Sequence, residues 1–110
     1  MQAFVIAAKR TAVMPRGGAF RGLSLEELAA PVLRALLDAA GIAADQVDEV
    51  VLSNVLGPGG NPARRVALAA GLPERVAGLS IDRQCAGGLD ALLIARGMVC
   101  LLYTSDAADE

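Results

Sequence analysis

The amino-acid sequence predicts an α/β protein with a parallel sheet. Short apolar runs typical of buried strands alternate with segments typical of helices along the first 99 residues. Strands that are joined by helices take right-handed crossovers, which makes neighbouring strands parallel. The 110-residue chain is 55% hydrophobic but only 3% aromatic, so its core must be built from Ala, Val, Leu and Ile.

Three strands are expected, over residues 3–8, 47–56 and 78–81. Residues 3–8 (AFVIAA) form a continuous apolar run, which is typical of a strand buried on both faces. Such a strand is too apolar to lie at the edge of a sheet, so it needs neighbours on both sides. Three strands do not supply them, and this part of the chain therefore has the pattern of the front half of a larger fold.

The first helix is expected between residues 24 and 41. Ser24 is a good N-cap, and Glu27 three residues later completes a capping box. Gly41 is suited to the left-handed position that ends a helix. Pro31 lies inside the segment and should kink the helix or break its first turns.

Two further helices follow. Asn61 is expected to cap the second, with Pro62 in its first position and Gly71 at its end. The third is expected over residues 83–98 and is apolar on most sides, which is typical of a helix enclosed between layers.

Composition excludes several classes of function. The net charge of -2 and pI of about 5.0 do not favour nucleic-acid binding. The absence of His makes a metal site improbable, and none is expected. Two cysteines without a C-x-x-C pair indicate no disulfide framework, hence a cytoplasmic protein. Charged residues interrupt every apolar stretch of 18 residues, so no membrane segment is expected.

The glycine-rich segment 57–62 (GPGGNP) has two interpretations. It follows a strand and opens a helix, the place where phosphate-binding loops lie. However, Pro58 and Pro62 remove N–H donors that a phosphate would need, and Pro62 stands where the third glycine of G-x-G-x-x-G would be. A structural turn is the simpler interpretation.

Cys85 is the candidate nucleophile, although free cysteines are most often inert and buried. It lies at a strand-to-helix junction, expected in the first turn of the third helix, where the helix dipole favours a thiolate. Arg83 adds positive potential. Ala86, Gly87 and Gly88 leave room for a substrate and N–H groups to face an oxyanion.

A nucleophilic cysteine normally needs a general base beside it, most often an imidazole. The helix dipole supplies only about 0.3–1 kcal/mol. Because the chain has no His, Cys85 is either not catalytic or depends on residues outside this sequence.

Three segments resemble the N-terminal domain of the thiolase family, which includes acetyl-CoA acetyltransferases and 3-ketoacyl-CoA thiolases. They are AAKRTAVMPRGGAF, VDEVVLSNVLGPGGNPARRVALAAGLP and LSIDRQCAGGLDALLIARGMV, which occur in this order between about Phe4 and Val99. The resemblance implies the N-terminal part of a layered fold, truncated here, with a mostly parallel sheet and helices on both faces. It also implies that segment 57–62 is a structural connection.

The resemblance further implies that Cys85 accepts the acyl group of acyl-CoA as a thioester. Claisen condensation with acetyl-CoA, or thiolysis of a 3-ketoacyl-CoA, would follow in fatty acid metabolism. The family's histidine and second cysteine lie in later motifs, and Cys100 does not match the latter. Coenzyme A thioesters would be substrates, with no permanently bound cofactor and no CoA-binding residue assignable here. A homodimer or homotetramer is implied for the full-length protein.

Two positions of the cysteine motif depart from the family pattern. Asp82 stands where Asn is frequent, and Gly87 where Ser or Thr is usual, which leaves the subfamily open. Residues 1–99 are therefore interpreted as a partial thiolase N-terminal domain. Residues 100–110 (CLLYTSDAADE) are interpreted as a foreign or disordered tail that is not native and resembles translated adaptor sequence.

Alternatives are a ketosynthase-like condensing enzyme of the same superfamily, a non-catalytic scaffold with this fold, and a nucleotide-binding module. The 110-residue chain by itself is expected to have no turnover.

Overall fold

The structure is a computed structural model that describes the backbone of residues 2–109 and the side chains of residues 2–101. Two parallel strands, β1 (Glu49–Ser53) and β2 (Ala77–Ile81), form the sheet, with Val51 opposite Leu79. The helix α2 (Pro62–Ala69) connects them. The prediction of a parallel sheet with helical crossovers is confirmed for these two strands.

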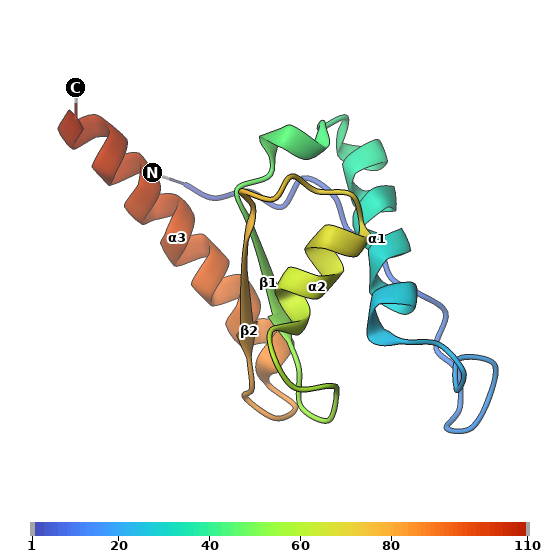
Figure 1. The fold of residues 1–110 in the computed structure, drawn as a ribbon. Helices are drawn as coiled ribbons and strands as arrows, with labels where there is room; N and C mark the ends of the chain where they lie inside the picture. Colours follow the sequence, from blue (N-terminus) through green and yellow to red (C-terminus); the bar gives the residue numbers. More distant parts are fainter. Residues whose placement is uncertain (1, 110) are drawn as a thin grey trace.

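Helices cover both faces of this sheet (Figure 1). The helix α1 (Leu25–Ala40) packs on α2, and α2 packs on both strands. On the opposite face α3 (Gly87–Asp109) contacts β1. A short 3₁₀ helix, η1 (Ala44–Gln46), leads from α1 into β1. The order of layers is that of an α/β fold, as the sequence predicts.

The buried core lies on the α1–α2 side of the sheet. Small aliphatic residues fill it, as expected from a composition with few aromatic residues. Its members come from α1, β1, α2 and the segment between α2 and β2: Ala30, Val50, Ala63, Ala67, Ala70, Leu72 and Val76. Among the side chains that the structure describes, none from α3 belongs to this core.

The expected ends of α1 are confirmed. The Glu27 N–H donates to Ser24 Oγ at 3.1 Å, and the Ser24 N–H donates to Glu27 Oε1 at 3.2 Å, which completes the capping box. Gly41 has a φ of 66°, the left-handed conformation that ends a helix at low cost for glycine.

The expectation that Pro31 breaks α1 is wrong, because the helix runs without interruption from Leu25 to Ala40. Proline lacks an N–H and so removes a single intrahelical hydrogen bond. The capping box and the burial of the adjacent Ala30 stabilise the turns that precede Pro31.

The expected strand over residues 3–8 is not formed. These residues take no part in the sheet, which has only β1 and β2 among the described residues. A strand needs a backbone partner along its whole length. Instead, Ala3, Phe4 and Val5 line a shared cavity of about 290 Å³ with Leu92 and Val99 of α3, while Phe4 and Val5 stay mostly exposed.

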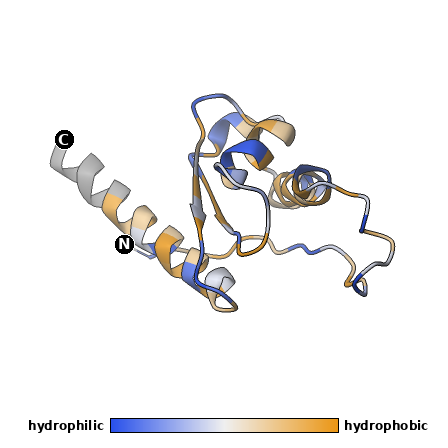
Figure 2. Cartoon of the chain, turned by 60° about the horizontal axis from the view of Figure 1, so that its bottom comes forward, coloured by the Kyte–Doolittle hydropathy of each residue, from blue (hydrophilic) through white to orange (hydrophobic). Residues whose placement is uncertain are grey.

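The helix α3 begins at Gly87, later than the expected residue 83, and extends to Asp109. Figure 2 shows that much of the described part of α3 is hydrophobic. Leu89 and Leu92 are nevertheless both more than 60% exposed. Asp90 and Arg96 interrupt the apolar run. The 18-residue stretch Gln84–Leu101 nevertheless has a mean hydropathy of 1.3, enough in length and composition to cross a membrane. The same composition is typical of a helix enclosed by protein.

Candidate active site at the carboxyl edge of the sheet

The two loops that the sequence singles out lie at the same edge of the sheet. Segment 54–61 follows β1 and segment 82–86 follows β2, and the carboxyl ends of parallel strands share one edge. Figure 1 shows both loops at the bottom of the molecule. This edge is where ligands bind in open α/β sheets.

Cys85 is exposed and lies in the turn between β2 and α3. Asp82 Oδ1 accepts a hydrogen bond from the Gln84 N–H at 3.1 Å, and Gln84 has a φ of 52°. A left-handed residue other than glycine costs about 1–2 kcal/mol, so the turn holds Gln84 against its own preference. Such strain persists only where surrounding contacts maintain it, and it is typical of functional sites.

The expected position of Cys85 in the first helical turn is wrong. The N–H of Ala86 donates to Arg83 O at 3.1 Å, and that of Gly87 donates to Gln84 O at 3.2 Å, which makes a tight turn. The first helical bond follows, from the Asp90 N–H to Ala86 O at 3.0 Å. Cys85 therefore precedes α3 by two residues.

The turn also changes which N–H groups are available. Those of Ala86 and Gly87 are used within it, so neither can face an oxyanion as expected. The space around Gly88 is a separate point, since a Cβ placed there would meet no described atom within 4 Å. Space beside the first turn of α3 is thus open at Gly88.

Arg83 is oriented by an ion pair. Its Nη1 lies 3.1 Å from Asp90 Oδ2, so the guanidinium connects the turn to the first turn of α3. The expectation that Arg83 adds positive potential at Cys85 therefore needs correction, because Asp90 partly balances that charge. The ion pair mainly connects the turn to α3.

No described side chain can serve Cys85 as a general base of the imidazole type, since the sequence contains no His. Cys100 lies on α3, thirteen residues beyond Gly87. At about 1.5 Å per residue this is roughly 20 Å along the helix. Among the residues that the structure describes, no group of three His, Cys, Asp or Glu side chains could hold a metal ion.

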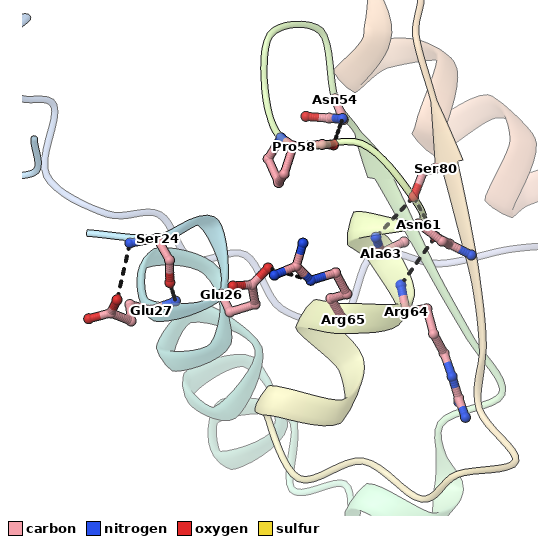
Figure 3. A network of polar contacts seen from close by, with 10 residues as sticks. All are labelled: Ser24, Glu26, Glu27, Asn54, Pro58, Asn61, Ala63, Arg64, Arg65 and Ser80. Carbon is pink, nitrogen blue, oxygen red and sulfur yellow. Dashed lines mark hydrogen bonds and ion pairs between the residues drawn. The ribbon is translucent and has the colours of Figure 1, made fainter. Parts of the chain in front are cut away.

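The glycine-rich loop is held by contacts within the protein (Figure 3). Asn54 Nδ2 donates to Pro58 O at 3.2 Å across the loop. At the start of α2, Asn61 Oδ1 accepts from the Arg64 N–H at 3.3 Å, while Ser80 Oγ accepts from the Ala63 N–H at 2.9 Å. The N–H groups of Ala63 and Arg64 at the start of α2 are thus occupied, which favours the structural turn over phosphate binding there.

Two features of this edge are not apparent from the sequence. One is the left-handed backbone of Gln84, a residue type that seldom adopts it. The other is the contact of Ser53, the last residue of β1, with Gly87. In the sequence, the one sign of this contact is the departure of Gly87 from the family pattern, and it does not indicate which residue lies opposite.

The fold and this cysteine turn define a thiolase-like protein. Residues 3–104 match the family model "Thiolase, N-terminal domain". The chain therefore belongs to the thiolase family. This decides against the ketosynthase-like alternative.

Among similar proteins is acetyl-CoA C-acetyltransferase VraB of Staphylococcus haemolyticus, whose name marks the assignment as provisional. It is 47% identical over 98 residues, which are 89% of this chain and 26% of VraB. YhfS of Bacillus subtilis, named in the same way, is 46% identical over 99 residues, 90% of this chain and 26% of YhfS.

A solved structure shares the fold. The crystal structure of Acat5 thiolase from Ascaris suum, in complex with coenzyme A, matches with a TM-score of 0.72 and 20% sequence identity. The match covers 76% of this chain and 22% of that one. The chain thus spans about a quarter of the length of the relatives it matches.

Proposed function

We propose that this chain is the N-terminal part of an acyl-CoA C-acyltransferase in which Cys85 is the acyl-accepting nucleophile. The observation that carries the proposal is the exposed Cys85 in a strained turn at the carboxyl edge of a parallel sheet. The similarity to proteins named acetyl-CoA C-acetyltransferase supports the reaction class.

In the proposed first step, the sulfur of Cys85 attacks the carbonyl carbon of an acyl-CoA thioester. The bond between that carbon and the coenzyme A sulfur breaks, and coenzyme A leaves with the proton that Cys85 gave up. The acyl group then remains on Cys85 as a thioester. Covalent catalysis of this kind divides one difficult transfer into two easier ones.

In the proposed second step, a Claisen condensation, the methyl carbon of acetyl-CoA loses a proton and attacks the carbonyl carbon of the acyl group. The bond between that carbonyl carbon and the sulfur of Cys85 breaks, the sulfur takes up a proton, and a 3-ketoacyl-CoA is released. Thiolysis of a 3-ketoacyl-CoA by coenzyme A is the reverse sequence. Proton transfer would depend on a histidine and a second cysteine, which the family resemblance implies and this sequence lacks. We therefore expect no turnover from the 110-residue chain. Coenzyme A thioesters are the proposed substrates, with no permanently bound cofactor and no resident metal.

Three further expectations accompany this proposal. The full-length protein is a cytoplasmic homodimer or homotetramer that acts in fatty acid metabolism and binds neither nucleic acid nor membranes. Residues 1–99 are the native partial domain. Residues 100–110, whose backbone continues α3 as far as Asp109, are a foreign tail. Sequencing the genomic locus from a clean clone tests this, since codons for these residues that are contiguous with the gene would contradict it.

A chimera tests the role of Cys85. Residues 3–99 replace the matched segment of YhfS, and release of coenzyme A is measured with acetyl-CoA as substrate. We expect turnover in the chimera and none after Cys85→Ser. Glu74→Gln, an exchange at an exposed residue before β2 and away from this edge of the sheet, should leave turnover unchanged. A Cys85→Ser chimera that retains turnover contradicts the assignment.

The isolated chain is tested with acetyl-CoA and intact-mass analysis. At most one acetyl group should be added, and peptide mapping should place it on Cys85 and not on Cys100. Steady release of coenzyme A by the 110-residue chain contradicts the expected inactivity.

A further inference from the structure

Ser53 and Gly87 meet where α3 begins on the sheet. Ser53 is the last residue of β1, and Gly87 is the first residue of α3. A Cβ placed on Gly87 would lie 2.8 Å from the Cβ of Ser53 and nearer still to its Oγ. Real Cβ atoms do not approach other heavy atoms so closely, so a side chain at position 87 excludes the present position of Ser53.

This contact lies next to the candidate nucleophile. Gly87 follows Cys85 by two residues, and its N–H closes the turn that contains Cys85 by donating to Gln84 O at 3.2 Å. A shift of Gly87 away from β1 therefore moves the turn with it. The position of the Cys85 thiol therefore depends on Ser53 through the backbone of the turn.

Besides the ion pair between Arg83 and Asp90, this end of α3 is held by its packing against β1. No described α3 side chain belongs to the buried core. Between β1 and α3 lies a cavity of about 670 Å³, lined at one end by Ser53 and Gly88 and further along by Ala91, Leu92 and Met98. At Gly87 the helix approaches the strand so closely that no Cβ fits between them, whereas a cavity separates the two elements further along.

We propose that Ser53 is a positioning residue for Cys85, acting as one unit with Gly87. The inference rests on the proposed role of Cys85 as nucleophile and names the residue of β1 that sets its location. The side chain of Ser53 fills the gap that glycine leaves, and this pairing sets the distance from β1 to the cysteine turn. A side chain can occupy the gap from either element, but not from both.

The pair is tested by exchanging its members in the 110-residue chain. Alkylation by iodoacetamide is followed by peptide mass spectrometry, with Cys100 in the same molecule as the internal reference. We expect Gly87→Ser to change the rate at Cys85, relative to Cys100, by about threefold or more, as contacting residues couple strongly. Adding Ser53→Gly should return that ratio to within about twofold of the parent value.

Two controls complete the design. Gly97→Ser adds the same side chain on α3 where no described atom lies within 4 Å of the new Cβ, and it should leave the ratio unchanged. The urea midpoint of each variant shows whether the chain still folds. If Gly87→Ser alone does not fold, the exchanged pair must still do so.

The proposal is overturned if the two substitutions act independently. The change in the Cys85-to-Cys100 rate ratio of the double variant is then the product of the changes in the two single variants. An exchanged pair that does not fold, although Ser53→Gly does, also overturns it. The alkylation ratio requires no turnover. If positions 53 and 87 do not couple in the alkylation ratio but the chimera turns over only with Cys85 present, the role of Ser53 is refuted. If the two positions couple but the chimera keeps turnover after Cys85→Ser, the role of Cys85 is refuted.

Discussion

The hydroxyl of Ser80 in β2 donates a hydrogen bond to Oδ1 of Asn61, the N-cap of α2, at 2.6 Å. The same hydroxyl accepts from the Ala63 N–H at 2.9 Å, and Asn61 Nδ2 donates to Gly78 O at 2.9 Å. Three hydrogen bonds therefore connect the start of the crossover helix to the strand that follows it. Figure 3 shows the two that Ser80 makes.

Ser80→Ala should lower the free energy of unfolding by about 1–2 kcal/mol, because the Ala63 N–H loses its partner in a partly buried place. Urea denaturation followed by circular dichroism measures this. Thr11→Ala is the matched control, since its hydroxyl bonds only to the carbonyl of the next residue in an exposed segment. Equal effects of the two substitutions would contradict the prediction.

Ser24→Ala should cost about 1 kcal/mol of stability through loss of the α1 cap. Glu27→Gln retains an acceptor in the capping box and should cost less than half as much. The two variants are compared by their urea midpoints. A larger loss for Glu27→Gln than for Ser24→Ala would show that charge and not the cap stabilises this end of the helix.

Gly78→Ala should destabilise the chain by about 1–3 kcal/mol, as overpacking does in well-packed sites. A Cβ at Gly78 would lie 2.8 Å from Arg64 Cα and 2.9 Å from Ala63 C, which are backbone atoms of α2 and cannot turn aside. Gly59→Ala is the control, since no described atom lies within 4 Å of its new Cβ. Thermal unfolding distinguishes them, and similar melting temperatures would refute the close approach.

Gln84→Val should destabilise the turn before α3, because a β-branched residue tolerates the left-handed conformation at φ 52° poorly. Gln84→Gly should be tolerated, since glycine adopts this conformation without steric cost. Stability and the alkylation ratio of Cys85 to Cys100 are measured for both. If Val is accepted as well as Gly, the turn is not strained.

The exposed apolar residues of α3 should make the isolated chain associate with itself as its concentration rises. Leu89→Gln together with Leu92→Gln, at positions 63% and 62% exposed, should reduce this association without loss of helix content. Analytical ultracentrifugation over a range of concentrations checks the change. Val66→Gln, at a fully buried position, is the contrasting variant and should unfold the chain.

The features predicted well from sequence depend on neighbouring residues. The capping box at Ser24, the left-handed Gly41 and the Asn61–Pro62 start of α2 each involve residues within four positions of one another. Their chemistry is local, so the sequence displays it directly.

The features predicted poorly depend on distant residues. Residues 3–8 have the composition of a strand, but a strand exists only where a partner offers its backbone, and β1 pairs only with β2 in the described part of the chain. Likewise, Gly87 was visible as a departure from a family pattern, but Ser53, 34 positions earlier, was not. The motif identifies the candidate nucleophile, whereas the conformation of its turn and the contact with Ser53 depend on how distant segments pack.

The location of the core on one face of the sheet has a consequence for cooperativity. The helices α1 and α2, the strand β1 and the segment between α2 and β2 share one buried cluster, while α3 contributes none of its described side chains to it. Hydrogen exchange should therefore divide the molecule into a slowly exchanging unit and a helix that opens on its own at lower free energy. Cys85 lies at the boundary between the two, so the geometry of its thiol depends on a junction that opens more readily than the buried unit.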